Sequence, residues 1–153
     1  PPLPANAATA SASGHASAAA QAAPARSSPA PADKATGAPV AGYDAAKGEQ
    51  LFSANCSACH QPTGEGLPGA FPPLKGNTVV NDADPSKHIR TVLFGLEGAT
   101  VDGVKYESAM PEFGTTLSDN DIANIIDYER SSWGNHGKPV AARDVAAERA
   151  KGK

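Results

Sequence analysis

The 153 residues carry a net charge of −3, but composition and charge divide them into three unlike segments. Residues 1–42 are rich in Ala, Pro and Ser, residues 43–136 hold nearly all the large apolar side chains with a net charge of −7, and residues 137–153 carry +3. An acidic folded segment excludes nucleic-acid binding, which needs a basic surface, and no stretch approaches the roughly 18 apolar residues of a membrane span.

The first segment, residues 1–42, is predicted to be a disordered linker. Its first 40 residues contain sixteen Ala, seven Pro and five Ser, and their largest apolar side chains are Leu3 and Val40. Such a chain cannot bury enough apolar surface to offset the entropy lost on ordering. No charged region followed by an apolar one follows Pro1, so we expect a processed product or a piece of a longer polypeptide.

The first predicted helix runs from Asp44, its N-cap, to about Asn55. Leu51 and Phe52 are expected on its inward face. Gly48 lies one turn before Phe52, and a glycine inside a helix costs about 1 kcal/mol relative to alanine. We therefore expect another backbone to approach this helix closely at Gly48.

Directly after this helix comes Cys56-Ser57-Ala58-Cys59-His60, the spacing typical of covalent haem attachment. Both sulfurs lie on one helix face and can form thioethers with two porphyrin vinyl groups, while His60 supplies the proximal iron ligand. A redox disulfide pair should accompany a βαβ pattern, and a structural zinc needs four ligands, whereas these are the only two cysteines. The sequence therefore predicts one covalent haem c, with His60 as a ligand of its iron.

Residues 61–76 are predicted to form a loop, because Gly and Pro recur throughout them. Within this loop, the stretch from Phe71 to Leu74 combines apolar side chains with a rigid backbone. Such a backbone can present a carbonyl to Nδ1 of His60, which would orient the imidazole and strengthen it as a ligand.

The next predicted helix begins at Asp84-Pro85 and ends at Gly95. Its buried stripe consists of Ile89, Val92 and Leu93. His88 lies beside that stripe, where we expect an ordinary boundary histidine rather than a ligand.

A short β-hairpin is predicted next, because Asp102-Gly103 lies between β-forming residues. The hairpin leads into a Pro/Gly-bounded loop that holds Met110, the only methionine of the chain. Methionine is usually a core filler, but this one follows His60 by fifty residues and can reach the other haem face. We expect Met110 to be the second axial ligand.

The last predicted helix has Ser118 as N-cap with Asp121 three residues later, and an apolar face that includes Ile125 and Tyr128. Gly134 is the expected C′ residue beyond its end. Trp133 either covers the haem crevice or fastens this end of the helix.

These features together resemble the class I cytochrome c family over about residues 43–136. The resemblance implies a small all-α fold around one covalent haem, with a short β-hairpin excursion and the linker outside it. It also implies that Gly48 and Phe52 pack against Ile125 and Tyr128 where the first and last helices cross. The Pro72 carbonyl should accept a hydrogen bond from His60. The implied cofactor-binding residues are Cys56, Cys59, His60, Pro72, Leu74 and Met110.

The predicted function is one-electron transfer, because iron ligated on both faces has no open position for chemistry. The alternatives are peroxidase-like haem catalysis and gas binding, which need an open or displaceable ligand. The narrower resemblance is to haem domains or subunits of periplasmic oxidoreductases, such as membrane-bound alcohol dehydrogenases and copper nitrite reductases. It implies a periplasmic electron-transfer domain or subunit, not an enzyme by itself. Its partner would be a redox protein or a fused catalytic domain, reached through the linker, and residues 137–153 would form a basic C-terminal extension.

Overall fold

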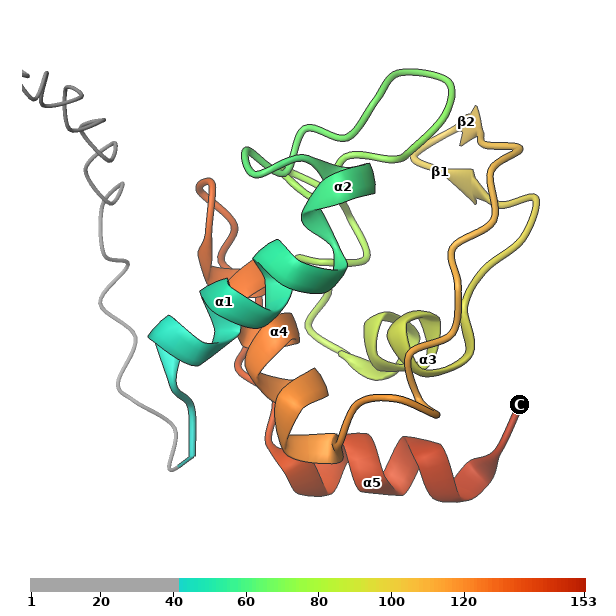
Figure 1. The fold of residues 1–153 in the computed structure, drawn as a ribbon. Coiled ribbons are helices and arrows are strands. Elements are labelled where there is room, and N and C mark those ends of the chain that lie inside the picture. Colours follow the sequence, from blue (N-terminus) through green and yellow to red (C-terminus); the bar gives the residue numbers. More distant parts are fainter. Residues whose placement is uncertain (1–41) are drawn as a thin grey trace, which may run out of the picture. The chain divides into compact units, whose positions relative to one another are not determined.

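The computed structural model describes residues 42–153, so the predicted linker lies almost wholly outside the described residues. The described part is helical, with one two-stranded antiparallel sheet, and the predicted fold class is confirmed (Figure 1). Its elements in chain order are α1 Ala45–Asn55, α2 Ser57–His60, α3 Ser86–Phe94, β1 Thr100–Val101, β2 Val104–Lys105, α4 Asp119–Ser131 and α5 Ala142–Lys151.

Helices α1 and α4 cross at Gly48, as the sequence predicts (Figure 1). A Cβ placed on Gly48 would collide with the Asn124 carbonyl oxygen and lie 3.1 Å from Cβ of Tyr128. The rings of Phe52 and Tyr128 pack with their centroids 5.3 Å apart. The glycine is therefore what allows the two backbones to come this close.

The predicted caps Asp44 and Ser118 are present, whereas α3 has Pro85 as its N-cap, one residue later than the predicted Asp84. Asp44 accepts from the Lys47 amide at 3.0 Å, and the Ser118 hydroxyl accepts from the Asp121 amide at 3.2 Å. At α3, the Asp84 carboxylate accepts from the amide of Ser86 at 2.9 Å. These side chains satisfy amides that have no partner inside the helix.

The end of α4 differs by one residue from the prediction. Ser132 is the C-cap, so the C′ position falls on Trp133 with φ +54°, and Gly134 with φ +84° follows it. The Trp133 ring packs 5.2 Å from the Phe52 ring, and its indole N–H donates to the Pro62 carbonyl at 3.0 Å. These contacts offset the cost of a left-handed backbone at a residue with a side chain.

The hairpin is present as predicted. Thr100 pairs with Lys105 and Val101 with Val104, so Asp102 and Gly103 form a two-residue turn. Both turn residues have positive φ, +49° and +81°, which a type I′ turn requires.

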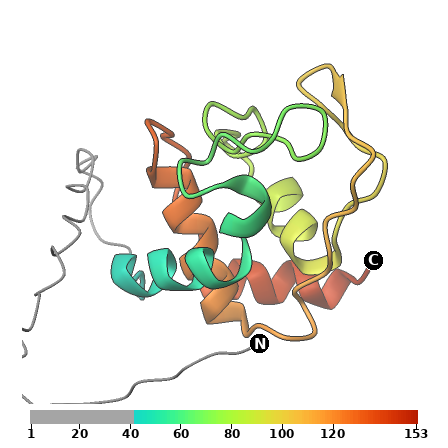
Figure 2. The same cartoon turned by 45° about the horizontal axis from the view of Figure 1, so that its top comes forward.

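Helix α5, in the basic extension, was not predicted. It packs against α3 and α4 (Figure 2), and Val140 and Val145 are buried in the same apolar cluster as Leu93 and Ile126. Arg149 fastens it by donating to the Asp119 carboxylate at 2.7 Å. The extension thus adds to the core beside α3 and α4.

Candidate functional site

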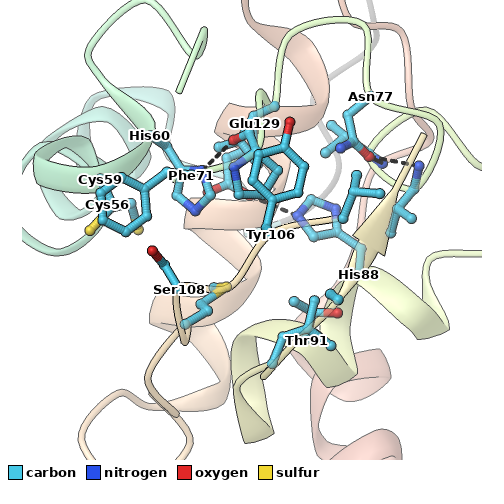
Figure 3. A pocket seen from close by; sticks show the side chains of 18 of the residues that line it. Cys56, Cys59, His60, Phe71, Asn77, His88, Thr91, Tyr106, Ser108 and Glu129 are labelled. Atoms are coloured by element: carbon cyan, nitrogen blue, oxygen red, sulfur yellow. Dashed lines mark hydrogen bonds and ion pairs between the residues drawn. The ribbon is translucent and has the colours of Figure 1, made fainter. Parts of the chain in front are cut away.

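A cavity of about 290 Å³ brings together side chains from four separate stretches of the chain (Figure 3). This volume lies near the lower end of the range for small-molecule sites, about 300–1,000 Å³. The stretches are 55–60, 71–80, 87–102 and 106–113, with a contribution from α4. Every residue that the sequence predicts as cofactor-binding lines it, namely Cys56, Cys59, His60, Pro72, Leu74 and Met110.

The two cysteines are held by α2, a single helical turn. The His60 amide donates to the Cys56 carbonyl at 3.0 Å, which closes this turn. Both thiols are free; Cys56 is buried and Cys59 is half-buried. Burial raises the pKa of the Cys56 thiol far above its usual range, and the carboxylate of Glu129 raises it further. Both cysteines line the same mainly apolar cavity.

The His60 imidazole is buried and oriented by the backbone of the following loop. Its Nδ1 lies 2.9 Å from the Pro72 carbonyl oxygen. A carbonyl only accepts, so Nδ1 carries the proton and the Nε2 lone pair is left for a metal. The hydrogen bond expected between these two residues is confirmed.

Met110 is held at the cavity by backbone contacts on both of its sides. Its amide donates to the Leu96 carbonyl at 2.8 Å, and the Leu96 amide donates back to the Met110 carbonyl at 3.0 Å. Gly95 makes this approach possible, because a Cβ there would lie 2.5 Å from the Met110 carbonyl oxygen. The Met110 thioether thereby lines the same cavity as His60.

Asn135 was not predicted to support the site, yet it fixes the loop that carries Pro72 and Leu74. Its side-chain oxygen accepts from the Gly76 amide at 2.8 Å, and its side-chain nitrogen donates to the Leu74 carbonyl at 3.0 Å. The residue is buried despite its polarity. The signal in the sequence was that this Asn comes directly after Gly134, the glycine that follows α4.

His88 lies deeper than predicted. It is 4% exposed rather than at a boundary, and its Nε2 lies 2.7 Å from a carboxylate oxygen of Glu129, itself 3% exposed. The Glu129 partner makes this burial possible. Both side chains line the cavity, whereas Trp133 does not, so Trp133 fastens the end of α4 and does not cover the site.

The donor set fits a covalently attached haem. Cys56 and Cys59 supply two free thiols on one turn, His60 supplies an unprotonated imidazole nitrogen, and Met110 supplies a thioether. The rest of the lining is mainly apolar. Among the described residues, no cluster of three or more His, Cys, Asp or Glu side chains suits a bare metal ion.

Such a fold and such a site define a small c-type haem protein. The family model described as Cytochrome c matches residues 45–133. This chain belongs to the cytochrome c family, and its cofactor is haem c bound through Cys56 and Cys59.

The chain is similar to cytochromes of two kinds. Cytochrome c-552 of Thermus thermophilus is 36% identical over 115 residues, which cover 69% of this chain and 86% of that protein. The cytochrome c subunit of alcohol dehydrogenase (quinone) from Gluconobacter oxydans (strain 621H) is 35% identical over 106 residues, covering 69% of this chain and 22% of the subunit. The fructose dehydrogenase cytochrome subunit of Gluconobacter japonicus is 38% identical over 112 residues, which cover 69% of this chain and 22% of that subunit. This chain thus spans about a fifth of those dehydrogenase subunits.

Among solved structures, the c-type cytochrome XoxG from Methylobacterium extorquens AM1 matches with a TM-score of 0.41 and 21% identity. The match covers 67% of this chain and 64% of that one. In the part of the chain that the structure describes, no helix has the length and apolar character needed to cross a membrane.

Proposed function

We propose that this domain carries single electrons through a haem c whose iron is held by Nε2 of His60 and the sulfur of Met110. The observation that carries the proposal is that the His60 imidazole, oriented by Pro72, and the Met110 thioether line one cavity with both cysteines. The haem supplies an iron that alternates between the ferric and ferrous states.

The residues of the chain set the properties of that iron. Pro72 holds the His60 ring and makes it a better donor through the Nδ1 hydrogen bond. The Met110 sulfur is a soft donor that favours the ferrous state, so we expect a relatively high reduction potential. The apolar lining keeps water from the iron, which leaves electron transfer as the function.

The axial ligands are tested by the absorption spectrum of the oxidised protein. Iron–methionine bonding gives a weak ferric band near the red edge of the visible, and we expect this band in the intact protein. Met110→Ala should abolish the band and lower the potential, while Leu67→Ala, at an exposed residue outside the cavity, should leave both unchanged. If Met110→Ala leaves the spectrum and potential unchanged, another group holds the sixth position.

The alternatives are peroxidase-like catalysis and gas binding, and both need a displaceable sixth ligand. A ferrous protein that binds carbon monoxide rapidly at neutral pH would favour them over a pure carrier. For electron transfer we expect slow or no binding to the intact protein and rapid binding to Met110→Ala. The two outcomes separate a closed haem from an open one.

The proposed partner is a periplasmic oxidoreductase, attached to the domain directly or through the Ala/Pro/Ser-rich segment of residues 1–42. Two relatives named above are cytochrome subunits of dehydrogenases, which supports this assignment. A flexible tether holds a carrier at about millimolar local concentration, so a weak contact suffices. The net charge of −7 over residues 43–136 favours a neutral or basic docking surface on the partner.

The tether is tested by comparing the intact protein with a domain cut free at Ala41. Electron transfer to a linked partner should be independent of protein concentration, whereas transfer from the cut domain should be second order. Replacing residues 1–40 with a Gly/Ser segment of equal length is the matched control. This variant should still transfer electrons at a rate that is independent of protein concentration. Equal rates for the cut and intact proteins at micromolar concentration would rule out the tether.

A further inference from the structure

Three buried side-chain nitrogens of the described residues have no hydrogen-bond partner, and only one of them belongs to a residue that lines the haem cavity. They belong to His88, Asn124 and Arg130, and His88 alone lines the cavity of about 290 Å³. A buried polar group without a hydrogen-bond partner is destabilising, so native proteins rarely keep one. The free Nδ1 of His88 therefore indicates a bound group inside this cavity.

The other ring nitrogen of His88 is already engaged. Nε2 lies 2.7 Å from Glu129, and both side chains are more than nine-tenths buried. The Glu129 carboxylate accepts from Nε2 and holds the ring in one orientation. Nδ1 is therefore the ring nitrogen that remains available to a group bound in the cavity.

The place of His88 in the cavity indicates the chemistry of that group. Figure 3 shows Cys56 and Cys59 on one side of His60 and His88 on the other. A haem carries its vinyl groups and its two propionates on opposite edges of the porphyrin. Because the vinyl groups are held at the cysteines, the propionate carboxylates point toward the side where His88 lies.

We propose that Nδ1 of His88 donates a hydrogen bond to a haem propionate, with Glu129 as the residue that positions the imidazole. The proposal rests on haem attachment at Cys56 and Cys59 but not on the identity of the sixth ligand. Both ring nitrogens donate in this arrangement, so the ring carries two N–H protons and one positive charge, and it lies between two carboxylates. The other charged side chains that line the cavity are Lys87 on α3 and Asp102 in the hairpin turn.

This contact has a consequence for the iron. A propionate carries negative charge close to the haem, and that charge stabilises the ferric state. A hydrogen bond from His88 withdraws part of this charge and therefore raises the reduction potential. The pair thus acts on the iron through the propionate, without touching the metal.

The contact is tested on the intact ferrous holoprotein, which is diamagnetic when both axial ligands are strong. Nuclear Overhauser effects should connect the His88 ring protons with the propionate methylene protons, and the Nδ1 proton should exchange slowly with water. Their presence supports the proposal. A His88 ring with contacts to protein protons alone overturns it, whatever the variants below show.

Variants of His88 and Glu129 distinguish a loss of imidazole positioning from a general destabilisation of the fold. Glu129→Gln keeps an acceptor for Nε2 and should retain the His88–propionate contact, whereas Glu129→Ala should lose it. The double variant His88→Leu/Glu129→Leu removes the imidazole together with Glu129, so that Glu129 is not left buried without a partner, and it should lower the potential. His136→Gln, at an exposed histidine outside the cavity, is the control and should leave it unchanged.

The outcomes also separate this inference from the proposed function. If the ferric iron–methionine band persists in the double variant while the potential falls, the propionate contact is supported independently of the sixth ligand. If the potential of the double variant matches that of the intact protein, His88 does not act on a propionate. Loss of the band in Met110→Ala bears on the axial ligand alone.

Discussion

The Pro72 carbonyl oxygen that accepts from Nδ1 of His60 lies against the backbone of Gly66. A Cβ on Gly66 would be 2.6 Å from this oxygen, far inside van der Waals contact, and would also collide with the Phe71 carbonyl. The Gly66 amide in turn donates to the His60 carbonyl at 2.9 Å. The glycine therefore determines how closely the Pro72 carbonyl can approach His60.

Replacing Gly66 with alanine should weaken the hydrogen bond between Pro72 and His60. A more weakly bonded imidazole is a poorer donor to ferric iron, so we expect a higher reduction potential. The φ of +63° and the collision together should lower stability by about 2–4 kcal/mol. Potentiometric titration and urea unfolding measure the two effects.

The matched control is Gly69→Ala in the same loop. Gly69 also has positive φ, +77°, but a Cβ there meets nothing within 4 Å. This variant should lose about 1 kcal/mol of stability from backbone strain, with no change in potential. Equal changes of potential in the two variants would show that the Pro72 carbonyl does not tune the haem.

Gly48→Ala should destabilise the domain although alanine is the better helix former. Alanine gains about 1 kcal/mol of helix propensity, but its Cβ would force α1 away from the Asn124 carbonyl. We expect a net loss of about 1–3 kcal/mol, measured by urea unfolding. Gln50→Ala, at an exposed position of the same helix, should be close to neutral, and a stable Gly48→Ala protein would mean that the helices do not touch there.

Val145→Ala tests whether α5 belongs to the folded core. Val145 is fully buried against residues of α3 and α4, so losing two methyl groups should cost about 1–3 kcal/mol. Arg143→Ala, on the exposed side of α5, is the control. A neutral result for Val145 would show that α5 detaches from the domain in solution.

Stability should fall as pH rises between about 4 and 6 because of Asp127. Burial raises the pKa of this carboxyl from 3.8 to about 6, although its bond from the Val140 amide acts against the shift. A group whose pKa is higher in the folded state binds protons more tightly there, so its contribution is complete below pH 3.8 and is lost as pH approaches 6. Asp127→Asn should remove this slope, worth about 1–2 kcal/mol, from denaturation curves measured across that range.

Asp121 provides a control of opposite sign. A hydrogen bond from Lys47, with a second from Ser118, lowers the pKa of this partly buried carboxyl below its ordinary value. Its stabilising contribution is therefore present at neutral pH and is lost as pH falls below about 4. Asp121→Asn should leave the slope between pH 4 and 6 intact, and a slope that survives in Asp127→Asn would assign it to another group.

The sequence was most informative where a local signal sets the structure. The caps at Asp44 and Ser118, the Asp102-Gly103 turn and the Cys56–His60 turn each depend on residues within a few positions of one another. The close helix contact at Gly48 was also predictable, because a glycine inside a helix is unfavourable unless a neighbouring backbone requires the space. Local reasoning also indicated that a carbonyl between Phe71 and Leu74 would meet His60, and the family resemblance identified it as that of Pro72.

What the sequence did not reveal depends on distant partners. Helix α5 has only Val145 as a fully buried apolar side chain, with Val140 just before its start, so its apolar pattern was too sparse to indicate packing. The depth of His88 depends on Glu129, 41 residues further along the chain. Trp133 adopts a left-handed backbone because of Phe52 and Pro62, which no short pattern contains.

The packing of α5 also determines when the core can be completed. Val140 and Val145, from the last stretch of the chain, share one apolar cluster with Leu93 of α3 and Ile126 of α4. A chain is synthesised from its N-terminus, so this cluster cannot close until nearly the whole domain has been made. The final residues therefore finish a core that the earlier helices leave open.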